Sequence, residues 1–329
     1  MSLKNNLKIF IFSLLFASLG YFLGKQNQNT SSVFSEIRSN KFNYQFINPL
    51  LECDSASFSQ NVTLDSLKAK LESYLDNLTS NHQITLASIY FRDLNNGPWI
   101  GINEKEDFSP ASLIKVPLMI TYYKQAESNP EILKQSLTYL PTKNNELTQD
   151  ILPSVTLTPE QKYPIEELIK NMIVYSDNQA YDLLLNNIDN QLLIETYQDL
   201  GVDISKAFND PNGNIISVKN YAAFFRILYN GSYLSNAMSE KALSLLSQVQ
   251  FQDGLVKGVN NPNIKIAHKF GERSYTDTGE KQLHDCGIVY LPQKPYLICT
   301  MTRGQDFKKL SSVIAEISKI IYEDVSQKP

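Results

Sequence analysis

The order of apolar patterns along the chain constrains its fold more than any other feature of the sequence. Strand-like runs occur in five places, at 84–94, 99–103, 264–271, 284–291 and 296–303. The first two runs are separated by Asn95-Asn96-Gly97-Pro98, which is typical of a hairpin. Since the other three runs follow a long helical region, we expect the first hairpin to join them in one antiparallel sheet.

Helical periodicity occupies the rest of the domain. Regularly spaced leucines predict a first helix over about 62–80, and a last helix over about 306–323 carries one apolar face. Further helices are predicted near 111–127, 165–174, 177–187, 190–200, 217–230 and 238–248. The sequence therefore predicts an α+β fold, layered αβα around the sheet, with the first and last helices on one face.

The composition excludes several classes of partner. The chain has 329 residues, of which 42% are hydrophobic and 19% charged, with a net charge of −4. No cluster of Lys and Arg exceeds a pair, so nucleic acid is not an expected partner. Three His and three Cys, without Cys-x-x-Cys or His-x-x-x-His spacing, argue against a zinc site. We expect neither a metal nor an organic cofactor.

Two of the cysteines lie on consecutive predicted strands joined by the Pro-Gln-Lys-Pro turn at 292–295. Counting back from this turn places Cys286 opposite Met301, which makes Cys286 and Cys299 diagonal neighbours. Diagonal positions are about 7–8 Å apart at Cα, beyond the usual reach of a disulfide. We therefore predict two free, buried thiols, with Cys53 also unpaired.

The N-terminal segment predicts export. Lys4 and Lys8 precede an apolar run over 9–24, which suits either a signal-peptide core or a short uncleaved anchor. The poor cleavage site at Ser18 and Gly20 favours the anchor, and a buried helix is the third alternative. We expect residues 1–26 to be this signal or anchor, in contact with the cytoplasmic membrane. The domain would then lie outside the cytoplasm, in the cell envelope.

A polar segment separates this run from the folded domain. Residues 27–60 are rich in Asn, Gln and Ser, and we predict a tether. Scattered aromatic residues before Asn48-Pro49 indicate that the tether packs onto the domain from Phe46 to Leu51. The domain itself is expected over 61–325.

The first motif with chemical potential is Ser112-Leu113-Ile114-Lys115, which follows a typical helix start at Ser109-Pro110. Ser112 would sit in the first helical turn, where free backbone N–H groups can stabilise an oxyanion. Lys115 lies one turn later on the same face, and a lysine shielded from water there can act as a base. The alternative is an amphipathic helix with an incidental surface lysine.

Two further short motifs follow. Ser176-Asp177-Asn178 lies between two apolar helical runs, where it caps a helix, aims a hydroxyl into a cleft, or does both. Lys269-Phe270-Gly271 lies on a predicted strand. A glycine there indicates close approach of a ligand or another backbone, while the lysine alone could simply protect an edge strand.

In order and rough spacing, these motifs resemble the Ser-x-x-Lys, Ser-Asp-Asn and Lys-Thr-Gly set of the class A β-lactamase-like serine hydrolases. The longer stretches FSPASLIKVPLM, MIVYSDNQAYDLLL and ISVKNYAAFFRILYNGSYLS also look like that family's sequences, and the likeness covers most of 62–325. The resemblance implies a β-lactamase/transpeptidase-like fold, with a five-stranded antiparallel sheet and an all-α subdomain. It also implies acyl transfer through an acyl-enzyme on β-lactams or D-alanyl-D-alanine-like peptides.

The same resemblance implies roles for individual residues. Ser112 would attack the carbonyl, Lys115 would take its proton, and Ser176 would relay a proton to the leaving nitrogen. The substrate-binding residues would be Asn178, Lys269, Gly271 and Glu272. Within this set Asn178 would hold the substrate amide and Lys115, Lys269 would attract a substrate carboxylate, and the N–H groups of Ser112 and Glu272 would form the oxyanion hole.

Two departures from the family pattern affect the expected activity. Phe270 replaces the usual Thr or Ser, so one hydroxyl near the substrate carboxylate is missing. The loop over 201–216 contains no Glu to activate a deacylating water, and only Asp203 and Asp210 supply carboxylates there. The sequence of 210–213 favours a turn, with Asp210 shaping it. We therefore expect slow deacylation, and a non-catalytic binder or sensor of muropeptides or β-lactams is the alternative function.

Overall fold

The computed structural model describes residues 37–38, 44–52, 64–95, 97–141, 149–202, 210 and 213–327. The signal or anchor predicted over 1–26 lies outside these ranges, as does most of the tether over 27–60. None of the helices in the described ranges is both long and apolar enough to cross a bilayer.

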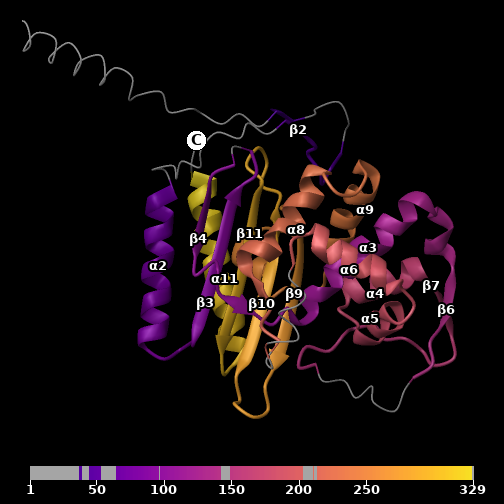
Figure 1. Cartoon of the computed structure of the whole chain (residues 1–329). Coiled ribbons are helices and arrows are strands. Elements are labelled where there is room, and N and C mark those ends of the chain that lie inside the picture. Colours follow the sequence, from indigo (N-terminus) through magenta and orange to yellow (C-terminus); the bar gives the residue numbers. More distant parts are fainter. Residues whose placement is uncertain are drawn as a thin grey trace, which may run out of the picture. The chain divides into compact units, whose positions relative to one another are not determined.

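A five-stranded antiparallel sheet lies at the centre of the fold (Figure 1). Its order is β4-β3-β11-β10-β9, with β3 at Leu86–Asp93, β4 at Trp99–Ile102, β9 at Ile266–Ser274, β10 at Lys281–Val289 and β11 at Tyr296–Gly304. The first hairpin therefore pairs with the C-terminal strands through β3 and β11. The predicted joining of the five strands in one sheet is confirmed.

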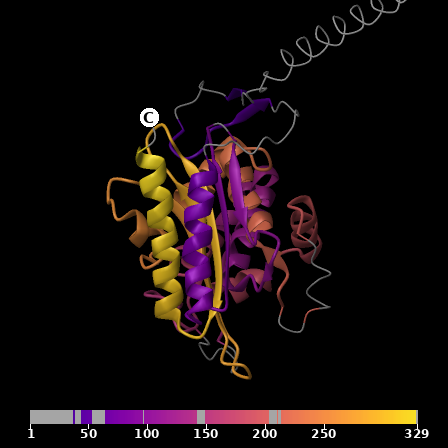
Figure 2. The ribbon, with the colours of Figure 1, turned by 90° about the vertical axis from the view of Figure 1, so that its left-hand side faces the viewer.

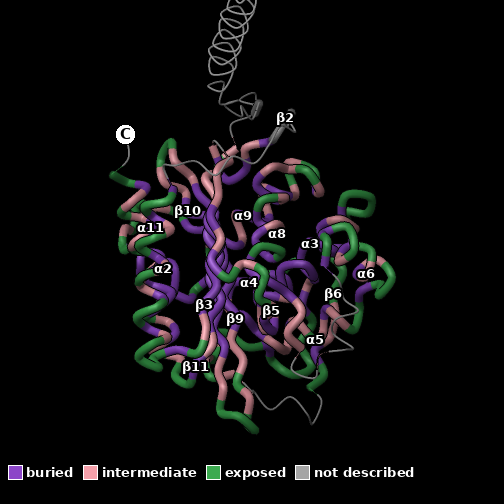
Figure 3. Tube along the Cα trace, turned by 60° about the vertical axis from the view of Figure 1, so that its left-hand side comes forward, coloured by how far each residue is buried: buried purple, intermediate pink, exposed green. Residues whose placement is uncertain are grey.

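Two long helices cover one face of this sheet, side by side in Figure 2. They are α2 (Asp65–Ser80), with Leu67, Leu71, Leu75 and Leu78 buried, and α11 (Phe307–Gln327). The opposite face packs against α8 (Val218–Asn230). Because both faces are covered, β11 is buried along nearly its whole length, as the purple strands in Figure 3 show. The predicted αβα layering is confirmed.

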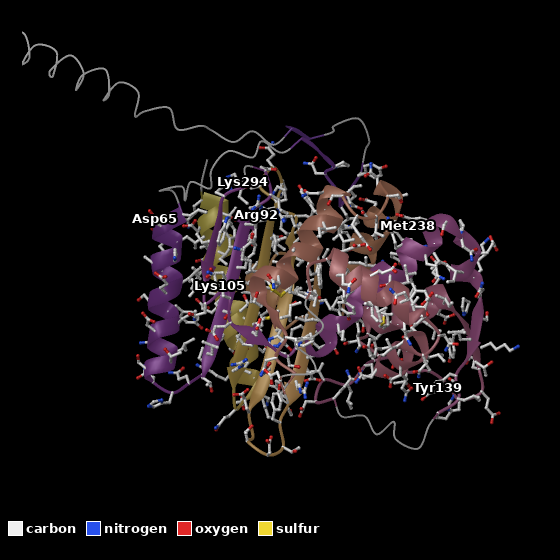
Figure 4. The ribbon with its side chains drawn as sticks, in the orientation of Figure 1. Asp65, Arg92, Lys105, Tyr139, Met238 and Lys294 are labelled. Carbon is white, nitrogen blue, oxygen red and sulfur yellow. A yellow bond between two sulfur atoms is a disulfide. The ribbon has the colours of Figure 1, made fainter. Side chains whose placement is uncertain are left out.

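The helical block between the two groups of strands lies beside β9. Its elements are β5 (Asp107–Phe108), η2 (Ala111–Ile114), α3 (Lys115–Ser128), η3 (Pro130–Lys134), β6 (Ser136–Thr138), β7 (Lys162–Pro164), α4 (Ile165–Val174), α5 (Asn178–Leu185), α6 (Asn190–Asp199), β8 (Ile216–Ser217), α9 (Asn236–Leu246) and α10 (Leu255–Val259). Figure 4 shows side chains filling the region from β9 to the β6–β7 ribbon near Tyr139. The predicted helices occur within a few residues of their expected limits, whereas α10 and the two-stranded ribbons were not predicted.

The end of the tether packs onto the domain as predicted. A two-stranded ribbon joins β1 (Ile37–Arg38) to β2 (Leu50–Glu52). Between these strands, Phe46 and Ile47 are buried, and the Glu240 carboxylate accepts hydrogen bonds from their N–H groups at 2.9–3.2 Å. The Phe46 ring also meets Tyr290 edge to face. These contacts attach residues 45–47, which the sequence assigns to the tether, to the folded domain.

The prediction of free thiols at Cys286 and Cys299 is wrong, because these residues are direct cross-strand partners and form a disulfide. The predicted turn was centred on 292–295, but β10 ends at Val289 and β11 begins at Tyr296. Lys294 N–H bonds to Leu291 O at 3.0 Å, so the turn spans 291–294, one residue earlier than predicted. The pairing register therefore shifts by two residues and places the two sulfur atoms together.

Reduction of this disulfide is expected to lower the free energy of unfolding by about 3 kcal/mol, because it releases a short loop in the unfolded chain. Urea unfolding with and without reductant measures the difference. The Cys286→Ser, Cys299→Ser double variant serves as control and should show no effect of reductant. Two free thiols at these positions in the unreduced protein would contradict the assignment.

Candidate active site

The serine of the first motif lies in a tight turn immediately before α3. The helix predicted from 111 begins as the 3₁₀ turn η2, with Leu113 N–H bonded to Pro110 O at 2.9 Å. Ala111 adopts a positive φ of 47°, which is strained for a residue with a side chain. Tyr221 on α8 donates its hydroxyl to Leu113 O at 3.1 Å and so holds this turn from the sheet side. Ser112 is thereby fixed at the start of a helix.

Lys115 is the first residue of α3, and its side chain is buried, with 1% exposed. Its Nζ lies 2.9 Å from Ser112 Oγ, 3.1 Å from Ser176 Oγ, 2.7 Å from Ser176 O and 2.6 Å from Asn178 Oδ1. Burial lowers the pKa of Lys115 to about 7, although Asp177, Asp182 and Glu272 oppose the shift. A substantial fraction of this amine is therefore unprotonated near neutral pH and able to accept a proton.

The second motif forms the turn between α4 and α5. Ser176 has a positive φ of 58°, and its side chain is fully buried. Asp177 caps α5 through Oδ1, which accepts from Gln179 N at 2.8 Å and Ala180 N at 3.4 Å. The predicted cap is confirmed, and the turn that Asp177 fixes places Ser176 Oγ 3.1 Å from Lys115 Nζ.

Lys269 approaches Ser176 from β9. Its Nζ donates to Ser176 Oγ at 2.9 Å and to Phe270 O at 3.0 Å. The side chain is fully buried, and the Phe270 ring lies 4.2 Å from Nζ with Phe251 stacked against it. Burial, and then the charge of Lys115, lower the pKa of Lys269 well below its usual value. Two lysines from different parts of the chain thus converge on one hydroxyl.

Gly271 lets β9 lie against the turn that holds Ser112. A Cβ built at this position would be 3.1 Å from both Leu113 N and Pro110 O. The predicted close approach at this strand glycine is therefore that of another backbone. The contact sets the distance between Ser112 and the strand.

Glu272 follows on the same strand and is half-buried. Its Oε1 accepts from Ile151 N at 2.7 Å. Burial raises the pKa of Glu272, while backbone N–H groups of Ile151 and Asp150 and the charge of Lys115 act in the opposite direction. The role implied for its own N–H group in an oxyanion hole stays a prediction.

Sequence reasoning missed one residue at this site. Gln149 donates from Nε2 to Ser176 O at 3.2 Å. No local pattern marks it, because it precedes α4 by a stretch without periodicity and is brought in only by the fold. It belongs to a segment over 149–151 that runs from the helical block to β9.

The loop expected to lack a deacylating base is described only in part. Gly213 N–H donates to Asp210 O at 2.9 Å, which is the bond of the predicted turn. Asp203 lies outside the described residues. Within the described ranges, no group of three or more His, Cys, Asp or Glu residues is placed to hold a metal ion.

Comparisons with known proteins match most of the chain. The model of a family described as "Beta-lactamase enzyme family" matches residues 70–325. The extended-spectrum β-lactamase PER-1 of Pseudomonas aeruginosa is 20% identical over 236 residues, which is 68% of this chain and 77% of that protein.

Solved structures show the same fold. PBP-A superposes with a TM-score of 0.65 at 21% identity, covering 80% of this chain and 97% of that one. The TLA-1 extended-spectrum β-lactamase gives 0.67 at 19% identity, with 80% and 100% covered. A PBP-A variant, similar at a TM-score of 0.63 and 23% identity over 79% of this chain and 97% of that one, is an acyl-enzyme complex with penicillin G.

Proposed function

Because the chain belongs to the beta-lactamase enzyme family of serine hydrolases, we propose that Ser112 is its nucleophile and forms an acyl-enzyme with β-lactams or with D-alanyl-D-alanine-like peptides. The observation that carries the proposal is the hydrogen bond from Lys115 Nζ to Ser112 Oγ, made by a buried amine whose pKa is lowered to about 7. The same amine also contacts Ser176 Oγ. Lys115 thus connects the attacking oxygen of Ser112 with the hydroxyl proposed to protonate the leaving nitrogen.

Acylation proceeds in two proton transfers. Lys115 takes the proton of Ser112 as Oγ attacks the substrate carbonyl, and the resulting ammonium passes a proton through Ser176 to the leaving nitrogen. The N–H groups of Ser112 and Glu272 stabilise the oxyanion. The amide of Asn178 supports this transfer, because its Oδ1 orients Lys115 at 2.6 Å.

The β9 residues shape the substrate side of the site. Gly271 keeps the strand close to the Ser112 turn, and Lys269 orients Ser176 Oγ at 2.9 Å. The resemblance to the family also implies that Lys269 attracts a substrate carboxylate. These assignments use no metal or cofactor.

Slow deacylation is the second part of the proposal. The loop over 201–216 offers no Glu, and the Asp210 carbonyl takes part in a turn. Water would then hydrolyse the acyl-enzyme slowly. Slow hydrolysis favours a peptidase, transpeptidase or penicillin-binding protein over an efficient β-lactamase. This missing base also favours the second candidate, a sensor that retains the acyl group, and multiple turnover of a peptide substrate separates the two.

The proposed function is tested by trapping with a labelled penicillin. The full-length protein should acquire one label that survives denaturation, and Ser112→Ala should acquire none. The Ser109→Ala variant is a matched control, because Ser109 lies three residues away and is buried without a place in the proposed proton path. Labelling of Ser112→Ala at the wild-type level would refute the assignment.

The rate of acylation is expected to rise with pH through about 7, because Lys115 must be unprotonated to act as base. Below that pH the rate should fall about tenfold per pH unit, as the free-amine fraction does. Stopped-flow acylation from pH 5.5 to 8.5 measures the profile. Asn178→Asp places a carboxylate against Lys115 Nζ and raises the pKa of this amine. The midpoint of the pH–rate profile should therefore move to higher pH. A rate that falls with rising pH would contradict the role of Lys115.

We also propose that the domain over 61–325 works outside the cytoplasm, in the cell envelope. The support comes from the charged flank and apolar run within 1–26, followed by the polar tether over 27–60. A reporter that is active only in the cytoplasm, fused after Lys328, should be inactive. Its activity would contradict this topology.

A further inference from the structure

The docked end of the tether is held by a single carboxylate of the domain. Glu240 on α9 accepts hydrogen bonds at 2.9–3.2 Å from three successive backbone N–H groups, those of Gln45, Phe46 and Ile47. Hydrogen bonds to an ionised acceptor are about twice as strong as those between neutral groups. Because all three donors belong to the main chain, Glu240 recognises the path of the backbone and not a particular side chain.

The Phe46 side chain adds an apolar anchor to this contact. Phe46 is 3% exposed, and its ring meets the Tyr290 ring edge to face with 5.3 Å between centroids and lies 5.6 Å from Lys265 Nζ. The Tyr290 hydroxyl donates to Phe46 O at 3.0 Å. Burial of an aromatic ring against a second ring in this orientation is stabilising. Since Lys265 immediately precedes β9 and Tyr290 immediately follows β10, the anchor lies at the end of the sheet.

A third contact comes from the end of α8. Asn48 N–H donates to Tyr229 O at 2.9 Å, in the last turn of this helix, where carbonyl groups have no partner within the helix. The segment over 45–48 therefore bonds to α8, to α9 and to the residue after β10, all of which are distant from it in sequence. It also precedes residue 70, where the match to the family begins. The domain thus carries a contact surface for a segment outside the matched part of the family.

We propose that the domain binds its own tether at this surface, the tether site formed by Tyr229, Glu240, Lys265 and Tyr290, and that docking shortens the free part of the tether. The shortening rests on the topology proposed above, with an uncleaved anchor over 1–26. When 45–48 is docked, the 18 residues from 27 to 44 lie between anchor and domain and span at most about 60 Å. Without docking, the 37 residues from 27 to 63 span at most about 130 Å. Docking therefore confines the active site to substrates close to the membrane.

Hydrogen exchange of the backbone amides at 45–48 tests the docking in the full-length protein. In the wild type these amides should exchange at least about 100-fold more slowly than in a synthetic peptide of residues 40–52, because exchange requires the segment to leave the tether site. Glu240→Gln should speed the exchange about tenfold, since a charged acceptor becomes neutral. Phe46→Ala should speed it about 100-fold, because it removes the buried ring.

The matched control for the charge is Glu131→Gln. It removes the same charge from a side chain that is 70% exposed on η3, far along the chain from the tether site, and it should leave the exchange at 45–48 unchanged. The comparison of the wild type with the free peptide decides the docking even where a variant does not fold.

The free length of the tether is measured by energy transfer from a dye on the domain to a labelled lipid. The full-length protein is placed in vesicles of phosphatidylethanolamine and phosphatidylglycerol, with the dye on Lys105→Cys, an exposed position, in a Cys53→Ser background. The Glu240→Gln, Phe46→Ala double variant should show less energy transfer than the wild type, because the released tether lets the domain move farther from the bilayer.

Each adverse outcome overturns a stated part of the proposal. Wild-type exchange as fast as in the peptide, or unchanged exchange in a folded Glu240→Gln variant, would overturn the docking. Protection that is lost on dilution would show that a second copy supplies the segment, and would overturn docking within one chain. Equal energy transfer in wild type and double variant would overturn the shortening, and failure of the full-length protein to bind vesicles would overturn the anchor on which it rests. None of these measurements uses Ser112, so failure of the proposed acyl transfer is distinguishable from them.

Discussion

Replacement of Lys115 by methionine is expected to slow the acylation of Ser112 by about 10²–10⁴-fold, because the general base is removed. Methionine has a similar length and no charge, so the helix around Pro117 and Leu118 keeps its packing. Acylation rates with a chromogenic β-lactam, compared for wild type and variant, measure the loss. A rate within a few-fold of wild type would show that another group takes the proton.

The same variant should keep or gain stability, which separates catalysis from folding. Lys115 has a pKa of about 7 in the folded state, below its value in an unfolded chain. The unfolded chain binds the proton more tightly, so this residue makes stability rise with pH between about 7 and 10.5. Urea unfolding at pH 6 should therefore find Lys115→Met no less stable than wild type. A large loss of stability would mean that the buried amine is a structural element.

The second large effect is the lifetime of the acyl-enzyme. General base catalysis contributes about 10²–10⁴-fold, so a loop without Glu should prolong the adduct by about that factor over an enzyme that has one. The decay is followed by intact mass after removal of free penicillin. Asp210→Asn should change the decay little if Asp210 only shapes the turn at 210–213. Rapid turnover of penicillin by the wild type that is lost in Asp210→Asn would identify Asp210 as the deacylating base. The protein would then be an efficient β-lactamase.

Much of the fold could be predicted because it follows from local periodicity. The apolar alternation of β3, β10 and β11 and the leucine spacing of α2 result from burial, so they are present in the sequence itself. Because the helical block separates the first two strands from the last three, a single sheet requires the first hairpin to pair with the C-terminal strands. Each of the four candidate residues lies in a short motif and could therefore be singled out, and the structure brings them together: Ser112, Lys115, Ser176 and Lys269. Their roles stay predictions.

What could not be predicted depends on contacts between distant segments. The disulfide depends on the exact position of the β10–β11 turn, where Lys294 N–H bonds to Leu291 O, because an error of one residue in the turn moves the strand pairing by two. The contact of Gln149 with Ser176 depends on the path of a segment without periodicity. The burial of Lys269 beneath Phe270 and Phe251 likewise follows from packing between β9 and the segment before α10. These contacts determine the surroundings of Ser176 and Lys269, which the motifs alone do not specify.

Peptide mapping of the penicillin adduct tests the central claim most directly. The full-length protein is incubated with benzylpenicillin, quenched at successive times, and analysed by intact mass and then by fragmentation of the modified peptide. We expect a single adduct on Ser112 that adds the mass of the intact penicillin. It should persist long after free penicillin is removed and should be absent from Ser112→Ala. An adduct on another residue, or no adduct on the wild-type protein at any of the times sampled, would contradict the assignment of Ser112 as nucleophile.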